Sequence, residues 1–128
     1  MQTTPNDLMT TFFAGFNAGD LDVTAGLYER TGVFVAQPAI LAEGTDAVRA
    51  ALAQFFALRP QLAVTASRIM IAADVALSLT KWTLDGKGPD GPIQMTGTAT
   101  DVLRRQVDGS WRVAIDNPWG IAALEVPS

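Results

Sequence analysis

Residues 101–119 read DVLRRQVDGSWRVAIDNPW, and this stretch decides the fold. Within it, Asp108-Gly109 is a strong signal for a tight turn between two runs rich in Val, Ile and Trp. The runs predict an antiparallel hairpin with strands over 93–106 and 111–117. Two similar runs precede it, over 62–71 and 75–84. The C-terminal half of the chain therefore predicts an antiparallel meander of four long strands.

Two irregularities are expected within this meander. Residues 85–92 read DGKGPDGP, and this composition is typical of a loop. The apolar positions of 75–84 change from odd to even numbers near Thr80, which indicates a β-bulge at that point.

The N-terminal half has helical rather than strand-like spacing. Thr4 is expected to cap a helix with Pro5 at its first position. Phe12 and Phe16 recur on the apolar face of that helix, and residues 17–19, Asn-Ala-Gly, are expected to end it.

A second and a third helix are expected further along. Asp20 can cap a short helix that reaches about Tyr28. A short strand over 33–36 and a loop to residue 44 follow. Thr45 is expected to cap the third helix, which Arg59-Pro60 closes.

Three helices followed by a bent antiparallel sheet, with short connections, predict one α+β domain over residues 1–128. The helices are expected to pack on the concave face of the sheet and to form a cone whose wide end leaves a pocket. Hydrophobic residues make up 48% of the chain and charged residues 17%. Part of this apolar surplus is expected to line the pocket or a subunit interface.

The residues that are missing exclude several classes of chemistry. The sequence contains neither Cys nor His, which excludes disulfides, thiolate nucleophiles and histidine-based triads. No dense carboxylate cluster points to a metal, and no cofactor is expected. A net charge of −4 and the lack of a basic run argue against a nucleic-acid partner or an anionic membrane surface. Without a signal peptide or an apolar run of membrane-spanning length, a cytoplasmic location is expected.

The most informative prediction concerns the register of the hairpin. A two-residue turn at 108–109 places Asp101 opposite Asp116, among Leu103, Ala114 and Ala99. Two carboxylates about 5 Å apart in such surroundings repel each other and are poorly solvated. One of their pKa values is then expected to rise, which suits a general acid/base or a hydrogen-bond donor. The alternative places both acids on the outer face in water, and a slip of one residue would separate them.

Aromatic side chains form the second group of candidates. Tyr28 and Trp82 are favoured as ligand contacts because each has a polar tip that needs a partner. Asn117 is expected either to orient a ligand carbonyl or to cap the strand end before Pro118. Four further aromatic residues could line the pocket, although most of them are expected to be plain core: Phe12, Phe16 and Phe55 from the helices and Trp119 from the C-terminal segment.

Several stretches resemble the nuclear-transport-factor-2-like (NTF2-like) superfamily, whose fold is a cystatin-like cone. They are NAGDLD at 17–22, EGTDAV at 43–48, DGSWRV at 108–113 and DNPWG at 116–120. The superfamily includes ketosteroid isomerases, SnoaL-type polyketide cyclases and limonene-type epoxide hydrolases. The resemblance covers nearly the whole chain and implies the fold and a homodimer, but it does not specify a function.

The resemblance to ketosteroid isomerases assigns roles to single positions. Asp101 matches the protonated aspartate of the oxyanion hole. Phe12 stands where that family has its oxyanion tyrosine, and Gln37 stands where it has its base. The same alignment makes Ala114, Asp116 and Pro118 pocket-facing. Since two of three catalytic groups are replaced, steroid isomerisation through that triad is not expected.

Two functions remain open from the sequence. In the first, the protein is an isomerase, cyclase or lyase acting on a small hydrophobic carbonyl compound. Asp116 then takes the role of base, and Asp101 donates to the developing oxyanion. In the second, the protein is a non-catalytic ligand-binding or dimerisation module. The enzyme requires buried acids with a raised pKa, whereas the module allows both acids to be solvated.

Overall fold

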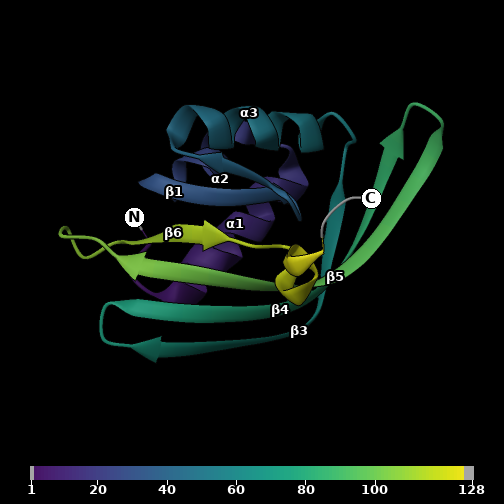
Figure 1. Cartoon of the computed structure of the whole chain (residues 1–128). Coiled ribbons are helices and arrows are strands. Elements are labelled where there is room, and N and C mark those ends of the chain that lie inside the picture. The colour runs from purple at the N-terminus through teal and green to yellow at the C-terminus, as the bar shows by residue number, and fades with distance from the viewer. Residues whose placement is uncertain (1, 126–128) are drawn as a thin grey trace.

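A strongly curved sheet frames the molecule (Figure 1). The computed structural model describes residues 2–125, which form three α-helices, six strands and a final 3-10 helix. The strand order is β2-β1-β6-β5-β4-β3, with β1 parallel to β6 and the other neighbours antiparallel. The elements are α1 (Pro5–Ala18), α2 (Leu21–Gly26), β1 (Tyr28–Gln37), β2 (Ile40–Glu43), α3 (Thr45–Phe56), β3 (Gln61–Ala72), β4 (Val75–Gly88), β5 (Gly91–Arg105), β6 (Trp111–Asp116) and η1 (Gly120–Leu124).

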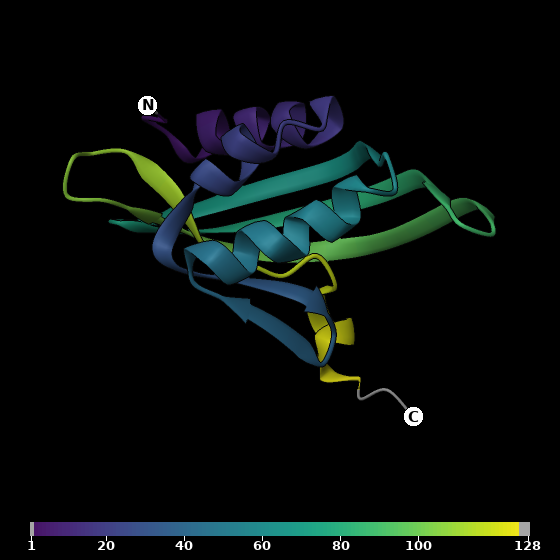
Figure 2. The same ribbon diagram turned by 90° about the horizontal axis from the view of Figure 1, so that it is seen from above.

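The helices lie against the sheet from both of its edges. Helix α1 contacts β3, and α3 contacts β1 and β2. Helix α2 contacts both α1 and α3, and Figure 2 shows the β4–β5 hairpin extending past the helices. One apolar core joins the layers, with Leu8 from α1, Leu52 from α3 and Leu103 from β5 each almost inaccessible to solvent. The predicted α+β class and the packing of helices on a curved sheet are therefore confirmed.

The first two helix starts follow the sequence signals. The Thr4 hydroxyl accepts a hydrogen bond from the Asp7 amide at 3.0 Å, and Pro5 occupies the first helical position. Gly19, with φ of 68°, ends α1 in the left-handed conformation that glycine tolerates best. Asp20 then caps α2 by accepting from the Val23 amide at 3.1 Å.

The third helix begins differently from the prediction. Thr45 is its first helical residue rather than its cap. Gly44, with φ of 87°, turns the chain from β2 into the helix one residue earlier, and no side chain caps this start.

Two assignments around β1 are also corrected. Tyr28, expected near the end of the second helix, is the first residue of β1, because the chain at Leu27 already pairs with β6 through the Val113 amide. The expected loop before residue 44 contains β2, which folds back on β1 and pairs Ala42 with Phe34. The strand predicted over 33–36 is thus part of a longer one.

The hairpin of β4 and β5 is longer and more regular than the sequence suggests. Residues 85–92 continue the ladder up to a pair between Gly88 and Gly91, instead of forming a loop. Even-numbered residues of β4 face the core from Ala76 to Gly86, so the predicted bulge near Thr80 is wrong. The bulge lies in β3, where the pairing shifts between Val64 and Ala66. Apolar residues at odd positions of β4 are on the outer face, which explains the misleading pattern.

The β5–β6 hairpin brings the two acids together by a different register from the predicted one. Its loop has three residues, 107–109, and is closed by a bond from the Gln106 amide to the Ser110 carbonyl at 2.7 Å. Leu103 consequently pairs with Val113, not with Ala114. A shift of one residue after this pair sets Val102 opposite Ile115. This bulge compensates for the longer loop and restores the alignment of the next residues, Asp101 and Asp116.

Close packing in the sheet depends on one glycine. Gly97 pairs with Trp82 across β4 and β5, and a Cβ atom at Gly97 would lie 2.7 Å from the indole ring. The ring cannot easily retreat, since its Nε1 donates to the Pro118 carbonyl at 2.9 Å.

We expect Gly97→Ala to reduce the free energy of unfolding by about 1–3 kcal/mol, because an extra methyl group overpacks a filled site. Urea denaturation followed by tryptophan fluorescence measures the change. Gly26→Ala is the matched control, because nothing lies within 4 Å of a Cβ atom there and little change is expected. Equal stability of the Gly97 variant and the wild type would contradict this packing argument.

Candidate functional site

A cavity of about 60 Å³ opens between the helices and the concave face of the sheet. That is more than the roughly 10–15 Å³ that one water needs. Its wall is mainly aromatic and aliphatic, and the charged lining residues in the described part of the chain are Asp101 and Asp116. The lining consists of Phe12, Phe13, Phe16, Phe34, Leu52, Phe55, Leu62, Thr80, Trp82, Leu84, Met95, Ala99, Asp101, Asp116, Pro118 and Trp119.

The two acids are buried in this wall. Asp101 is 5% exposed and Asp116 is 7% exposed. The Tyr28 hydroxyl donates to Oδ2 of Asp116 at 2.5 Å. The Asn117 backbone amide donates to Oδ1 of Asp101 at 2.9 Å. Each carboxyl group is therefore held on one side by the protein while it lines the cavity with its neighbour.

Burial and mutual repulsion change the protonation of the pair. Burial raises the pKa of Asp101 well above the ordinary value, and the charge of Asp116 and a side-chain hydrogen bond with it raise that pKa further. Burial also raises the pKa of Asp116, while hydrogen bonds from Asp101 and Tyr28 act in the opposite direction. Burial and the charge of Asp116 raise the pKa of the Tyr28 hydroxyl, which stays protonated and able to donate.

The hydrogen bonds indicate where the shared proton lies. Asp116 has two donors directed at it, Tyr28 and Asp101, and so it is the acid better stabilised as a carboxylate. Asp101 accepts the Asn117 amide with one oxygen, and its pKa is raised more strongly than that of Asp116, so Asp101 is the acid that keeps its proton. A neutral acid beside a carboxylate in an apolar wall offers both a proton donor and a proton acceptor.

Tyr28 has a different place from the predicted one. It does not line the cavity but lies behind Asp116, where it is almost fully buried. It reaches the acid because β1 runs parallel to β6, with Tyr28 paired to Val113. A polar tip on an otherwise buried tyrosine was the available signal in the sequence. Its partner, 88 residues away, was not evident.

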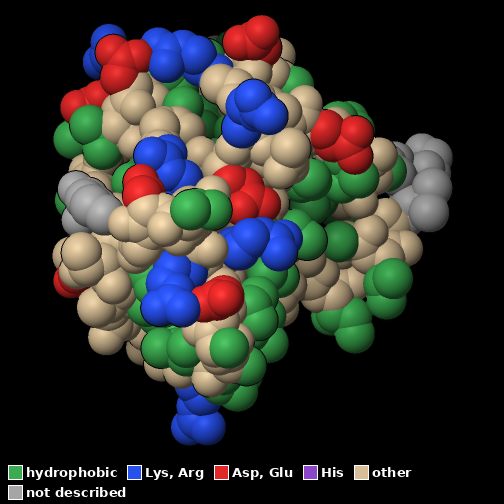
Figure 3. Space-filling model, turned by 90° about the vertical axis from the view of Figure 1, so that its left-hand side faces the viewer, with side chains coloured by type: hydrophobic (Ala, Val, Ile, Leu, Met, Phe, Trp, Pro, Cys, Tyr) green, Lys and Arg blue, Asp and Glu red, His purple; other side chains and the backbone are tan. Residues whose placement is uncertain are grey.

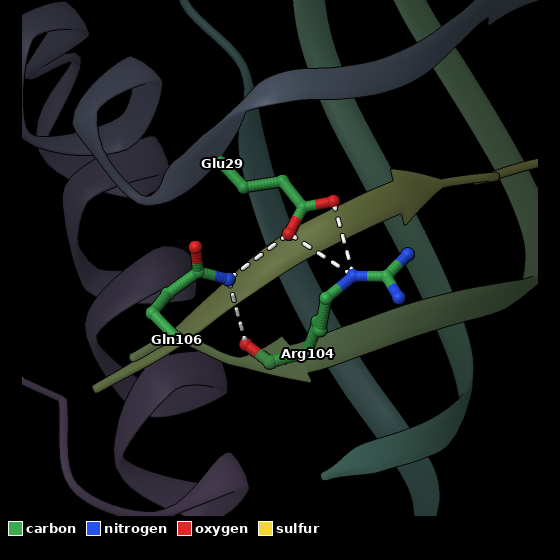
Figure 4. A network of polar contacts seen from close by, with 3 residues as sticks. All are labelled: Glu29, Arg104 and Gln106. Carbon is green, nitrogen blue, oxygen red and sulfur yellow. Dashed lines mark hydrogen bonds and ion pairs between the residues drawn. The ribbon is translucent and has the colours of Figure 1, made fainter. Parts of the chain in front are cut away.

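A polar cluster holds the chain next to Tyr28 (Figure 4). Glu29 accepts from Nε of Arg104 at 3.2 Å and from the amide of Gln106 at 2.9 Å. The same Gln106 amide donates to the Arg104 carbonyl at 3.1 Å. Because β6 lies between β1 and β5 in the sheet, this Glu29 cluster spans β6 and ties the start of β1 to the end of β5.

Only some of the predicted pocket residues line the cavity. Six of them line the cavity: Phe12, Phe16, Phe55, Trp82, Ala99 and Trp119. Gln37 does not: it is exposed, because the register of β1 shifts after Val35 and turns this last residue of the strand outward. Ala114 is buried but outside the cavity lining, at the bulge that the predicted register lacked.

Asn117 has the capping role rather than the ligand-orienting one. Its side-chain amide donates to the Thr100 hydroxyl at 3.0 Å and to the Gly120 carbonyl at 3.1 Å. These bonds shape the turn that leads to Pro118 and directs the Asn117 backbone amide at Asp101.

Both cavity tryptophans contribute ring surface rather than donors. The Trp82 indole is bonded to the Pro118 carbonyl, and the Trp119 indole donates to the Val35 carbonyl at 2.8 Å. The polar tip of Trp82 thus finds its partner in the protein. Cavity residues that the sequence did not indicate include Phe34, Leu62 and Met95, because no spacing rule identifies which core side chains border a void.

A second pocket, of about 290 Å³, contains neither Asp101 nor Asp116 and is lined by Gln2, Gly26, Leu27, Asp108, Ser110, Trp111 and Arg112. In residues 2–125, no group of three or more acidic side chains is placed to hold a metal ion. None of the helices in that range is long and apolar enough to cross a membrane. On the side shown in Figure 3, Lys and Arg side chains alternate with Asp and Glu.

Comparisons of structure identify similar folds. A candidate dehydratase of the NTF2-like family from Streptomyces avermitilis superposes with a TM-score of 0.75 at 18% identity, covering 86% of this chain and 89% of that chain. An NTF2-like protein with a cystatin-like fold from Novosphingobium aromaticivorans gives a TM-score of 0.75 at 14% identity, covering 94% and 86%. A protein of unknown function from Mycobacterium tuberculosis gives 0.73 at 24% identity, covering 87% and 70%.

Comparisons of sequence identify the family. No curated protein matches the chain at the significance required. The SnoaL-like domain model matches residues 9–114, from α1 to β6, and ends two residues before Asp116. Since this match covers most of the chain, and the solved neighbours share its fold, the protein belongs to the SnoaL-like domain family and has the cystatin-like fold of NTF2-like proteins.

Proposed function

We propose that the cavity binds a small hydrophobic carbonyl compound and that the protein carries out acid/base chemistry on it, as an isomerase, cyclase or lyase. One observation carries this proposal: Asp101 and Asp116 lie side by side, buried, in the wall of an apolar cavity. Such pairs are uncommon as pure structure, because two unpaired carboxyl groups are unfavourable in an apolar environment. No cofactor is required for this chemistry.

The roles of the two acids follow from their hydrogen bonds. The neutral Asp101 donates a hydrogen bond to the carbonyl oxygen of the ligand. The carboxylate of Asp116 removes a proton from the carbon beside that carbonyl, and the electron pair of the C–H bond moves into an enolate whose negative oxygen is held by Asp101. Tyr28 keeps Asp116 oriented and limits how basic it becomes.

Three outcomes of such an enolate correspond to the three enzyme classes. Return of the proton to a different carbon is an isomerisation. Expulsion of a leaving group from the neighbouring carbon is a lyase reaction, and attack on a second electrophilic carbon of the same molecule is a cyclisation. A solved neighbour with the same fold is a candidate dehydratase, and dehydratases are lyases.

A second proposal is a homodimer formed through the outer face of the sheet. Met70, Leu77, Val102, Ile115 and Val33 are successive neighbours across five strands, from β3 to β1. Met70, Leu77 and Ile115 in this apolar row are exposed. A contiguous apolar row on an otherwise mixed surface favours a self-complementary contact. If the acids prove inactive, this face supports the alternative of a ligand-binding or dimerisation module.

The raised pKa of Asp101 predicts a pH-dependent stability. A folded-state pKa above the unfolded one stabilises the folded protein at pH values below the unfolded pKa, about 3.9. This contribution is lost as the pH rises through the folded pKa. Asp101→Asn, which mimics the neutral acid, should therefore match the wild type near pH 4 and exceed its stability at pH 8. Urea melts at both pH values, and carboxyl titration by NMR, measure this. Ordinary pKa values at both acids would remove the acid/base proposal.

Asp116→Asn should abolish proton transfer without harming the fold. We expect the α-hydrogen exchange of cyclohexanone in D2O, catalysed by the wild type, to fall to the background rate in the variant. Thermal stability should remain equal or rise, since the change removes a buried negative charge. Asp90→Asn, in the exposed β4–β5 turn, is the control and should exchange normally. Exchange that persists in the Asp116 variant would rule out Asp116 as the base.

The proposed homodimer is tested by a charge in the apolar row. Sedimentation of the wild type should show a dimer, and Leu77→Lys should shift it toward the monomer. Val107→Lys, at the fully exposed tip of the β5–β6 hairpin, should leave the dimer intact. A monomeric wild type at high concentration, or a dimer indifferent to Leu77→Lys, would contradict this interface.

A further inference from the structure

Thr80 is a polar residue in the cavity wall to which the mechanism above gives no role. It lies in β4, its side chain faces the core, and it is 2% exposed. Its neighbours on that face of the strand include Trp82, and across the ladder it pairs with Ala99. Thr80 is thus the one neutral polar side chain among the described cavity residues, in a wall that is otherwise acidic or apolar.

The Thr80 hydroxyl has no hydrogen-bond partner in the part of the chain that the structure describes. It takes part in none of the side-chain hydrogen bonds of residues 2–125. In the same range, no fully inaccessible side-chain oxygen or nitrogen lacks a partner. The Thr80 oxygen therefore keeps a small accessible surface, and the Thr80 side chain lines the cavity. A buried hydroxyl without a partner is unfavourable, so a group that enters the cavity is the natural candidate to bind it.

The sheet register relates this hydroxyl to the acids. Ser78 pairs with Asp101, and Thr80 pairs with Ala99, two residues along the same ladder. Thr80 and Asp101 are consequently diagonal neighbours on the inner face, with Cα atoms roughly 7–8 Å apart and Cβ atoms somewhat closer. A single small molecule in the cavity can contact both side chains.

We propose that Thr80 is a ligand-binding and specificity-determining residue, and that the ligand carries a second oxygen, a hydroxyl or carbonyl, a few bonds from the carbonyl that meets Asp101. This inference rests on the proposed function, which places the first carbonyl of the ligand at Asp101. The expected ligand is a compact apolar molecule with two oxygen-containing groups on one edge. The Thr80 hydroxyl donates a hydrogen bond to the second of these groups or accepts one from it.

Matched ligands separate the contribution of the second oxygen. The probes are cyclohexanone and its 3-hydroxy and 4-hydroxy derivatives, which differ by one hydroxyl group and its position. Binding is measured by NMR titration of the backbone amides. We expect at least one hydroxy derivative to bind the wild type about fivefold more tightly than cyclohexanone, the effect of one added neutral hydrogen bond.

Variants of Thr80 assign that preference. Thr80→Val keeps the branched shape, and we expect it to remove the preference while leaving the affinity for cyclohexanone within about twofold. Thr80→Ser, which keeps a hydroxyl, should retain part of the preference. Two results would overturn the inference. One is a preference for the hydroxy derivatives that persists in Thr80→Val, and the other is the absence of this preference from the wild type, which would mean that only water contacts the Thr80 hydroxyl.

Two further measurements make the outcome unambiguous. Without ligand, Thr80→Val should be as stable as the wild type or more stable, and a clear loss of stability would show that the hydroxyl has a protein partner, which overturns the inference. If cyclohexanone binds the wild type and Asp101→Ala weakens this binding, but neither hydroxy derivative binds more tightly, the proposed role of Thr80 is refuted and the proposed function is not. Failure of cyclohexanone to bind at all would sink the proposed function together with it.

Discussion

The whole site depends on placing two carboxyl groups next to each other away from water. Such an arrangement is unfavourable unless one carboxyl keeps its proton and the other receives hydrogen bonds. The fold meets both conditions with groups from separate elements: Tyr28 at the start of β1 donates to Asp116, and the Asn117 amide after β6 donates to Asp101. The parallel pairing of β1 with β6 is what brings the tyrosine within reach.

The remaining structure encloses this pair and fixes its surroundings. Helices α1 and α3 contribute aromatic and aliphatic side chains that keep the cavity apolar. The two cavity tryptophans are tied to backbone carbonyls, so the wall has a defined shape. The Glu29 cluster joins β1 to β5 across β6 and thereby supports Tyr28 from its neighbouring residue. Most of these interactions are long-range in sequence.

Prediction and structure agree where local interactions decide the structure, and they differ where interactions between distant residues decide it. Local signals were reliable where neighbours along the chain determine the outcome, as at the Thr4 and Asp20 caps and the Gly19 helix end. They failed where pairing partners decide, as for residues 85–92, whose glycines and prolines suggest a loop although the opposing strand holds them in a ladder. The acids were paired correctly by an incorrect register, because two one-residue errors cancelled. Tyr28 as the partner of Asp116 and Thr80 as a wall residue required the three-dimensional arrangement.

Because of the bulge near Ala114, the length of the β5–β6 loop does not by itself decide on which face of the sheet Asp116 lies. In a regular ladder, lengthening a turn by one residue would move every later side chain to the opposite face. Here the extra residue of the loop is absorbed before the strand reaches Asp116. The tip of the hairpin can therefore vary in length among relatives while the acidic wall stays in place, provided that a compensating residue is gained or lost at the bulge. Counting from the turn glycine pairs the two acids in this chain only because the longer loop and the bulge offset each other.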